Sequence, residues 1–404
     1  MMTKAKLPGE FWSFIAARLF FVLGIRMITT IVIYQVFHLA NTYMVGIAGL
    51  AEFVPAVIAA LYAGHYIDRH NKKNILVWAY VFYMLFGILL ALLSFSNFQL
   101  PVNIKIIAIL AIVFCTGITR SFAGPAANSM IAAIVPREEL AKAISLNSST
   151  WLLSSMVGHA TGGLLIATAG ISNAYFVAAA LMFTAILFAL QIKPKPPVPT
   201  AAKEPMVQAI RHGFAFVYSN KNLLGVLSLD LFAVLFGGAV AFIPEIAERV
   251  LHTNAIGYGF LNAAMDIGSL ASISILLKFP MKKKQGLKMM LAIAGFGLFI
   301  IVFGLSEVYW LSFMALVLAG AFDAISVVVR GTILQLNTPD ELRGRVASIN
   351  LIFINSSNEL GQFESGITSR WFGTIPAIIA GGVMSVVIVA ATWLKFPKLR
   401  KLEY

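Results

Sequence analysis

Long apolar stretches recur along the whole chain and constrain its fold more than any other feature. A helix needs about 20 consecutive apolar residues to cross the hydrocarbon core of a bilayer. Twelve such stretches occur, at 13–38, 44–66, 74–96, 104–122, 144–168, 173–192, 222–246, 256–279, 288–304, 309–329, 346–370 and 374–394. The pattern predicts an all-α integral membrane protein with twelve transmembrane helices and no room for a soluble catalytic domain.

Composition agrees with this prediction. Hydrophobic residues make up 59% of the chain and charged residues 12%, against about 25% charged residues in a soluble domain. The single cysteine, Cys115, excludes a disulfide within the chain, and no Cys/His cluster has metal-ligand spacing. We therefore expect no cofactor, no metal and no enzymatic activity. The first apolar stretch is longer than a signal-peptide core, and we expect it to be retained.

The distribution of basic residues predicts the orientation in the membrane. With the N-terminus in the cytosol, 25 of the 30 Lys and Arg residues fall in cytosolic segments. Basic residues favour the cytosolic side, so we expect both termini in the cytosol of a bacterial inner membrane. The net charge of +13 then reflects orientation and attraction to anionic lipid rather than binding to nucleic acid.

A proline-rich segment divides the spans into two groups of six. Prolines at 194, 196, 197 and 199 prevent a continuous helix there. Next, Met206, Ile210, Phe214 and Val217 have the spacing of a short amphipathic helix on the cytosolic face. The predicted organisation is a six-helix bundle at 1–192, a linker at 193–221 and a second bundle at 222–404.

The two halves are related by an internal repeat. At an offset of 203, identities pair Pro136 with Pro339, Glu138 with Glu341, Ser145 with Ser348, Asn147 with Asn350, Ser154 with Ser357, Gly158 with Gly361 and Gly163 with Gly366. An even number of spans per half gives both copies the same orientation. This predicts two pseudo-symmetric bundles, a substrate path between them and alternating access by rocking.

The connection after the second span, Gly64 to Lys73, reads GHYIDRHNKK. It resembles the loop signature of the major facilitator superfamily, Gly-x-x-x-Asp-Arg-x-Gly-Arg/Lys-Arg/Lys, with Asn71 at the second glycine position. The resemblance implies that Asp68 and Arg69 belong to a latch on the cytosolic side. Asp68 is expected to cap a neighbouring helix N-terminus or to pair with a basic residue, with Arg120 as the favoured partner. We expect Asn71 to adopt a left-handed turn. The alternative is an ordinary positive-inside loop.

The fifth span is similar to the antiporter motif of that superfamily. The matching residues are Ser145, Ser154, Gly158, His159, Gly162 and Gly163. Serine replaces two glycines and His159 stands in place of a proline. Small residues at this spacing let helices approach closely. We favour a hydrogen-bonded packing role for His159, with titration during transport as the alternative.

Three runs in the C-terminal half, residues 229–238, 323–350 and 358–366, resemble the bacterial efflux branch of the superfamily, which includes the enterobactin exporter and the macrolide efflux proteins. The resemblance implies a monomeric exporter of a siderophore or drug-like molecule, an antiporter linked to drug resistance. The cargo itself does not follow. The arginine motif expected in the fourth span is not present between Ala111 and Gly117.

Charged residues within the spans are costly and are the natural functional candidates. For transport or coupling the candidates are Arg26, Glu52, His159, Asp266, Glu359 and Glu364; for gating they are Asp68, Arg69, Arg120, Asp230, Asp323 and Arg330. Glu359 lies near the middle of its span without a basic neighbour there, and is the first candidate for a proton carrier.

Two ion pairs are predicted among these charges. Arg26 and Glu52 lie at similar depth on consecutive spans and are expected to pair. Asp323 and Arg330 lie seven residues apart on one helix face and form the expected gating pair, with Asp230 as a separate gate or cap.

The sequence as a whole favours proton-driven export of a small amphipathic molecule. An importer or a lipid flippase of the same fold is the alternative. An enzyme is disfavoured because no nucleophile–base pair or phosphate loop is visible, and a channel is disfavoured by the repeat.

Overall fold

The computed structural model describes residues 7–95, 100–195, 206–279, 281, 283–339, 342–395 and 399. Throughout these residues the regular structure is helical, without a β-strand. The chain divides into two compact units, residues 1–39 with 51–201 and residues 40–50 with 202–404. The bundle boundaries predicted at 192 and 222 stay a prediction, and each unit is described separately below.

The first unit is built from long antiparallel helices. They are α1 (Gly9–Leu39), α2 (Thr42–Arg69, from residue 51 onward), α3 (Lys72–Leu93), α4 (Val102–Ile134), the short helix η1 (Arg137–Glu139) and α5 (Leu140–Leu190). Helix α4 continues well past the predicted end at 122, with Pro125 inside it. A proline removes one backbone hydrogen bond but is tolerated where the remaining turns are well packed, as Ala126 and Ala127 are here.

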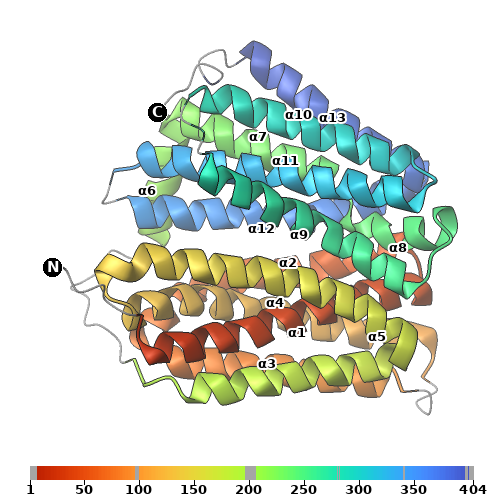
Figure 1. Ribbon diagram of the computed structural model, residues 1–404, viewed down its shortest axis with the longest axis horizontal. Helices are drawn as coiled ribbons and strands as arrows, with labels where there is room; N and C mark the ends of the chain where they lie inside the picture. Colours follow the sequence, from red (N-terminus) through yellow and green to blue (C-terminus); the bar gives the residue numbers. More distant parts are fainter. Residues whose placement is uncertain are drawn as a thin grey trace. The chain divides into compact units, whose positions relative to one another are not determined.

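Helix α5 consists of two arms. Its backbone leaves the helical conformation at Gly170, which has φ 83° and ψ 165°. Figure 1 shows the chain folding back on itself between the two arms. The arms correspond to the fifth and sixth predicted spans.

The second unit contains the remaining helices. They are α6 (Met206–Ser219), α7 (Lys221–Gly237), η2 (Val240–Phe242), α8 (Ile243–Glu245), η3 (Ile246–Val250), α9 (Ala255–Lys278), α10 (Gln285–Leu305), α11 (Tyr309–Leu336), α12 (Arg343–Phe372) and α13 (Thr374–Lys395). The first residues of α2 also belong to this unit.

The seventh span differs from its prediction as one continuous helix over 222–246. Helix α7 ends at Gly237, and the chain continues through a 3-10 turn, a short α turn with Pro244 and a π turn to Val250. The break at two consecutive glycines has a local cause, because glycine weakens a helix.

Ten helical stretches in the described residues are long and apolar enough to cross a membrane. One of these stretches contains both arms of α5, and α12 supplies a further long helix. The described residues thus hold the twelve predicted spans, and the all-α, twelve-helix fold class is confirmed.

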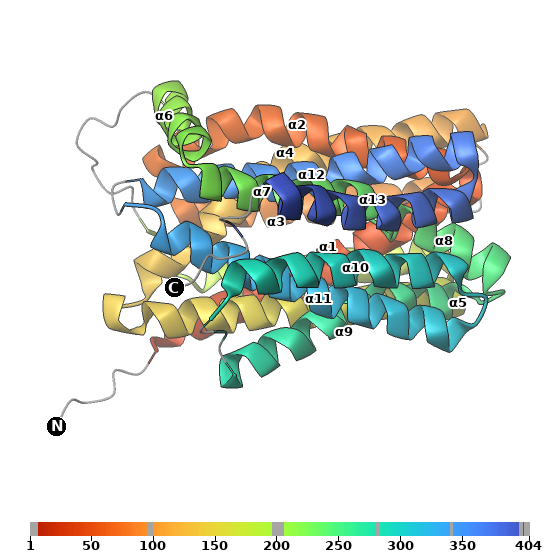
Figure 2. The same cartoon turned by 90° about the horizontal axis from the view of Figure 1, so that it is seen from above.

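Helix α6 occupies the region where a short amphipathic helix was predicted. Val217 on α6 is buried in a core cluster with Leu223 and Val226 of α7 and Val346 of α12. The ring of Phe214 lies 6.5 Å from that of Phe353. Figure 2 shows α6 steeply inclined to the long helices of its unit. The side chains of Met206 and Ile210 lie outside the described residues.

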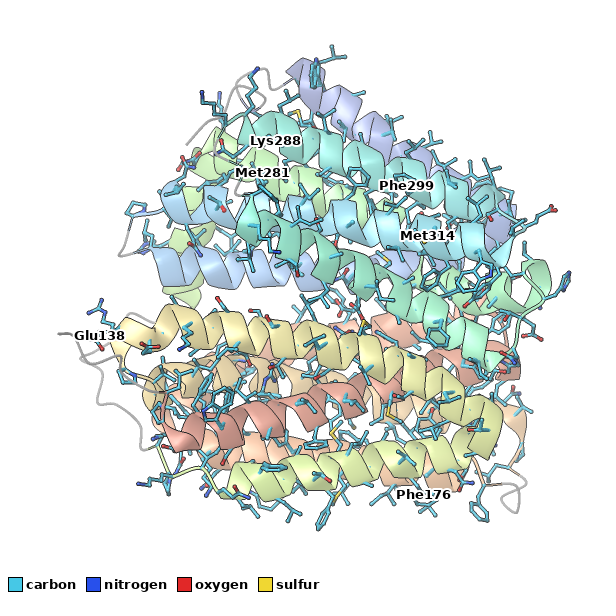
Figure 3. The ribbon with its side chains drawn as sticks, viewed as in Figure 1. Glu138, Phe176, Met281, Lys288, Phe299 and Met314 are labelled. Atoms are coloured by element: carbon cyan, nitrogen blue, oxygen red, sulfur yellow. The ribbon has the colours of Figure 1, made fainter. Side chains whose placement is uncertain are left out.

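The outward faces of the long helices carry large apolar side chains. Phe176 on the second arm of α5 and Met314 on α11 are both exposed, and Figure 3 marks these two residues. Trp12, Trp310, Trp371 and Trp393 near the helix ends are also exposed. Apolar surfaces of this extent are stable in lipid and not in water, as expected for a membrane protein.

Candidate functional site

Helix α1 packs closely against the first arm of α5. A β-carbon on Gly158 would lie 2.7 Å from the backbone oxygen of Leu23 and 2.8 Å from Cβ of Arg26. One turn later, a β-carbon on Gly162 would lie 3.3 Å from Cβ of Thr30. The small residues of the motif in the fifth span therefore bring two helix backbones together, as predicted.

His159 forms a hydrogen bond at this contact. Its Nδ1 lies 2.7 Å from the hydroxyl oxygen of Thr30, and that hydroxyl lies 2.9 Å from the backbone oxygen of Arg26. A hydroxyl has one proton to donate. If the Thr30 hydroxyl donates its proton to the backbone oxygen of Arg26, then Nδ1 of His159 must carry the proton that is donated to the Thr30 oxygen. This network supports the packing role favoured for His159.

Two arginines of α1 converge on one tryptophan of α5. The guanidinium carbons of Arg18 and Arg26 lie 5.2 Å and 5.3 Å from the ring centroid of Trp151. Arg18 is 5% exposed, and its Nε donates to Oδ1 of Asn147 at 3.4 Å. The buried Nε of Arg26 has no hydrogen-bond partner within the described residues.

The structure corrects the predicted partner of Glu52. Its carboxylate accepts a hydrogen bond from Nη1 of Arg120 at 3.0 Å, joining α2 to α4. In the described part of the chain Arg26 pairs with no carboxylate and lies over Trp151 instead. Similar depth on consecutive spans suggested a contact, but the orientation of each side chain about its helix axis directs Glu52 toward α4.

A second correction concerns the charges of α7 and α11. Arg330 forms an ion pair with Asp230, rather than the predicted pair with Asp323 two turns away on its own helix. Asp230 also accepts a hydrogen bond from the hydroxyl of Ser326 at 2.9 Å. Asp230 and Arg330 are each 3% exposed. They tie α7 to α11 inside the second unit, where Asp323 is only partly buried.

Helix α12 carries the carboxylates Glu359 and Glu364. Glu359 is 6% exposed, and Glu364 is partly buried. Between them a β-carbon on Gly361 would lie 3.0 Å from the backbone oxygen of Leu235 on α7. The hydroxyl of Ser365 donates to the backbone oxygen of Gly238 at 3.0 Å. Glu359 is therefore held on a helix that packs firmly against α7.

Asp266 lies on α9 and is partly buried. Its neighbours fix α9 against α11, because a β-carbon on Gly268 would clash with the backbone oxygen of Val317. The hydroxyl of Ser269 donates to the backbone oxygen of Gly320 at 3.0 Å. Asp266 shares this helix contact region but is on a different helix pair from Asp230 and Arg330.

The first residues of α2 contact α12 within the second unit. A β-carbon on Gly46 would lie 3.0 Å from Cα of Gly366. A β-carbon on Gly366 would likewise lie 3.0 Å from Cα of Gly46. The guanidinium of Arg370 lies 4.8 Å from the ring centroid of Tyr43. The hydroxyl of Thr42 donates to the carboxylate of Glu245. None of these contacts was predicted.

The loop after α2 departs from expectation at Asn71. This residue has φ −65° and ψ 114° and caps α3 by accepting from the backbone N–H of Lys73 at 3.0 Å. The predicted left-handed turn is wrong because an N-cap requires an extended residue with a side-chain acceptor. Asp68 and Arg69 are exposed at the end of α2. The pairing of Asp68 with Arg120 stays a prediction.

Sequence reasoning missed the contact of Arg18 with Trp151. A signal was available, because Arg18 interrupts an apolar stretch and Trp151 lies inside a span rather than at its end. Groups of three or more His, Cys, Asp or Glu side chains able to hold a metal are absent from the residues that the structure describes.

The twelve-helix fold, with charges buried within its helices, is the fold of the major facilitator class. A bacterial homologue of the human lysosomal transporter Spinster, inward-facing and unoccupied, matches with a TM-score of 0.76 at 16% identity over 99% of both chains. A D-xylose–proton symporter matches with a TM-score of 0.78 at 13% identity, over 98% of this chain and 99% of its own. These likenesses establish the fold.

The sequence places the chain within that class. Residues 24–404 match the family model described as transmembrane secretion effector, and the chain belongs to this family. The enterobactin exporter of Shigella boydii is 28% identical over 365 residues, which cover 89% of this chain and 85% of the relative. The predicted resemblance to the major facilitator superfamily and its bacterial efflux branch is thus confirmed. The protein is a multi-pass membrane transporter.

Proposed function

We propose that this transporter exports a small amphipathic molecule, a siderophore or a drug-like compound, from the cytosol by proton antiport. The support for export comes from the relatives, which are named exporters of enterobactin. Both termini lie in the cytosol of a bacterial inner membrane, in agreement with the distribution of basic residues. The protein acts as a monomer through alternating access, without a bound cofactor.

The observation that carries proton coupling is the burial of Glu359. A carboxylate that is only 6% exposed on a transmembrane helix is costly to place in a bilayer and marks a functional position. Binding and release of one proton at Glu359 then shift the balance between the inward-facing and outward-facing states. Protonation from outside drives the return to the inward state. Glu364 and Asp266 are secondary carriers.

The test is Glu359→Gln in proteoliposomes with a defined orientation, with cargo export and internal pH read together. The cargo panel contains siderophores, macrolides and cationic dyes. Glutamine keeps the volume and hydrogen-bonding capacity of the protonated acid. We expect proton flux coupled to export to disappear while exchange of cargo for cargo continues. The matched control is Glu307→Gln, an exposed carboxylate between α10 and α11, which should leave coupling intact.

Full coupling in Glu359→Gln would remove this residue from the mechanism, and the same measurement on Glu364→Gln and Asp266→Asn would then locate the carrier. The direction of counterflow in oriented vesicles separates export from the alternative, an importer or lipid flippase of the same fold. Net uptake toward the cytosolic face would contradict export.

A further inference from the structure

The first unit contains two cations within its helices, Arg18 and Arg26, whose charge is not matched by a carboxylate in the described residues. Among its described transmembrane residues, Arg120 pairs with Glu52 at 3.0 Å. Arg18 and Arg26 form no ion pair with a carboxylate in the part of the chain that the structure describes. An unmatched guanidinium inside a bilayer is costly and marks a site of function. Two of them on one helix, about 12 Å apart along its axis, require a specific explanation.

In the second unit, a buried arginine is paired with a carboxylate. Arg330 faces Asp230 across the contact of α7 with α11, and Ser326 completes the hydrogen bonding of the carboxylate. No such carboxylate is placed opposite Arg18 or Arg26 in the described residues. The missing negative charge is therefore the property that distinguishes the two sites.

Both guanidiniums contact Trp151. Both lie within 5.3 Å of its ring centroid, a distance at which the negative face of an indole attracts a cation. This interaction stabilises the arginines in part, but it supplies no hydrogen-bond acceptor. The buried Nε of Arg26 has none, whereas Arg18 has Asn147 at 3.4 Å. Trp151 thus contacts both arginines, but no carboxylate of the described residues lies beside them to balance their charge.

The two arginines differ in how exposed they are. Arg18 is 5% exposed, whereas Arg26 is only partly buried. The stem of Arg26 is fixed because its Cβ lies against Gly158. Arg26 is the more accessible of the two guanidiniums, and Arg18 contributes positive potential from deeper in the bundle.

We propose that Arg26 and Arg18, arranged about Trp151, form the binding site for the negatively charged group of an anionic organic substrate. The group is an oxyanion, such as a carboxylate, sulfonate or phenolate, and Arg26 donates to it through its planar guanidinium. The proposal rests on the proposed transport function and adds the charge class of the cargo.

The test compares two probes that share one ring system and differ in charge, 1-pyrenesulfonate and 1-pyrenemethylammonium. Affinities are measured by titration of the full-length protein in phosphatidylcholine nanodiscs, which carry no net lipid charge. We expect the sulfonate to bind about ten-fold more tightly or better, the value of one charge-assisted hydrogen bond. This comparison in the unsubstituted protein depends on no variant folding correctly.

Variants then locate the site. Arg26→Gln should weaken sulfonate binding about ten-fold and leave the ammonium probe unchanged. Arg26→Lys should lose less, because it keeps the charge but not the fork. Arg370→Gln is the matched control, an arginine over an aromatic ring in the second unit, and should change neither affinity. Equal affinities for both probes, or equal losses in Arg370→Gln, would overturn the proposal.

A phospholipid headgroup carries the same chemistry as an anionic substrate, and two further arms separate them. In the first, nanodiscs with phosphatidylglycerol replace the neutral ones. In the second, export of both probes is followed in proteoliposomes. Preferential export of the sulfonate that is lost in Arg26→Gln supports the substrate site. Displacement of the sulfonate by phosphatidylglycerol without any sulfonate export overturns it in favour of a lipid site.

The two proposals fail in different ways. If neutral or cationic cargo is exported and the sulfonate is not preferred in binding or export, the anion site is wrong and the exporter stands. If no cargo is exported but the sulfonate still binds through Arg26, the proposed exporter is wrong and the anion site remains as a binding site.

Discussion

Gly170 and Gly373, which lie 203 residues apart, have the same backbone conformation, with φ 83° and ψ 165° at the first and φ 86° and ψ 160° at the second. Each ends a long helix and begins the next. The earlier pair of the repeat behaves alike, since Gly158 packs on α1 and Gly361 packs on α7. The repeat seen in the sequence is therefore also present in backbone geometry.

Replacing Gly170 or Gly373 with alanine should destabilise the protein by about 1–3 kcal/mol at each site. The reason is conformational, because no atom lies within 4 Å of a β-carbon at Gly170, whereas its φ and ψ suit only glycine. Gly331→Ala is the matched control, since it also has free space but lies within helix α11. There alanine should stabilise by up to about 1 kcal/mol. Unfolding of the full chain in mixed micelles measures all three, and equal effects would contradict a strained backbone.

The Asp230–Arg330 pair should behave as a coupled unit. Asp230→Asn or Arg330→Gln alone leaves one buried charge unmatched and should destabilise by about 3–5 kcal/mol. The double variant removes both charges and should recover a large part of that loss. Thermal unfolding of the four proteins gives the coupling energy. Additive losses in the double variant would show that the two side chains act independently.

The contact between Gly46 and Gly366 leaves no space for a side chain. Alanine at either position would place its β-carbon 2.9–3.0 Å from atoms of the facing helix, and the helices must separate. We expect a loss of about 1–3 kcal/mol from overpacking. Gly124→Ala in α4, where nothing lies within 4 Å, serves as the control and should be neutral or stabilising. Unchanged stability in Gly46→Ala would mean that α2 does not pack on α12 in this way.

The hydrogen bond between Thr30 and His159 should contribute to stability through pairwise coupling. Thr30→Val and His159→Leu each remove one partner from the α1–α5 contact, where the two atoms lie 2.7 Å apart. A double-mutant cycle should give a coupling of about 1 kcal/mol. In the same variants the dependence of export on pH should keep its shape, as expected for a packing histidine. A changed pH profile in His159→Leu would instead favour titration of His159 during transport.

The placement of the charged residues shows where prediction from sequence stops. Glu52 and Arg26 lie at comparable depth on consecutive spans, and depth can be read from the distance to each span's end. The rotation of each side chain about its helix axis cannot be read from the sequence. That rotation directs Glu52 toward Arg120. Asp323 and Arg330 share a helix face, but Arg330 forms its ion pair with Asp230 on α7.

The number and order of the spans, the internal repeat and the family could all be predicted from the amino-acid sequence. Hydropathy and motif spacing are properties of neighbouring residues along one chain. Three features could be seen only in three dimensions: the pairing of the buried charges, the position of Trp151 beside two arginines, and the capping of α3 by Asn71. These features depend on which helices are neighbours and on how each is rotated about its axis. Side-chain packing between segments far apart in sequence sets both.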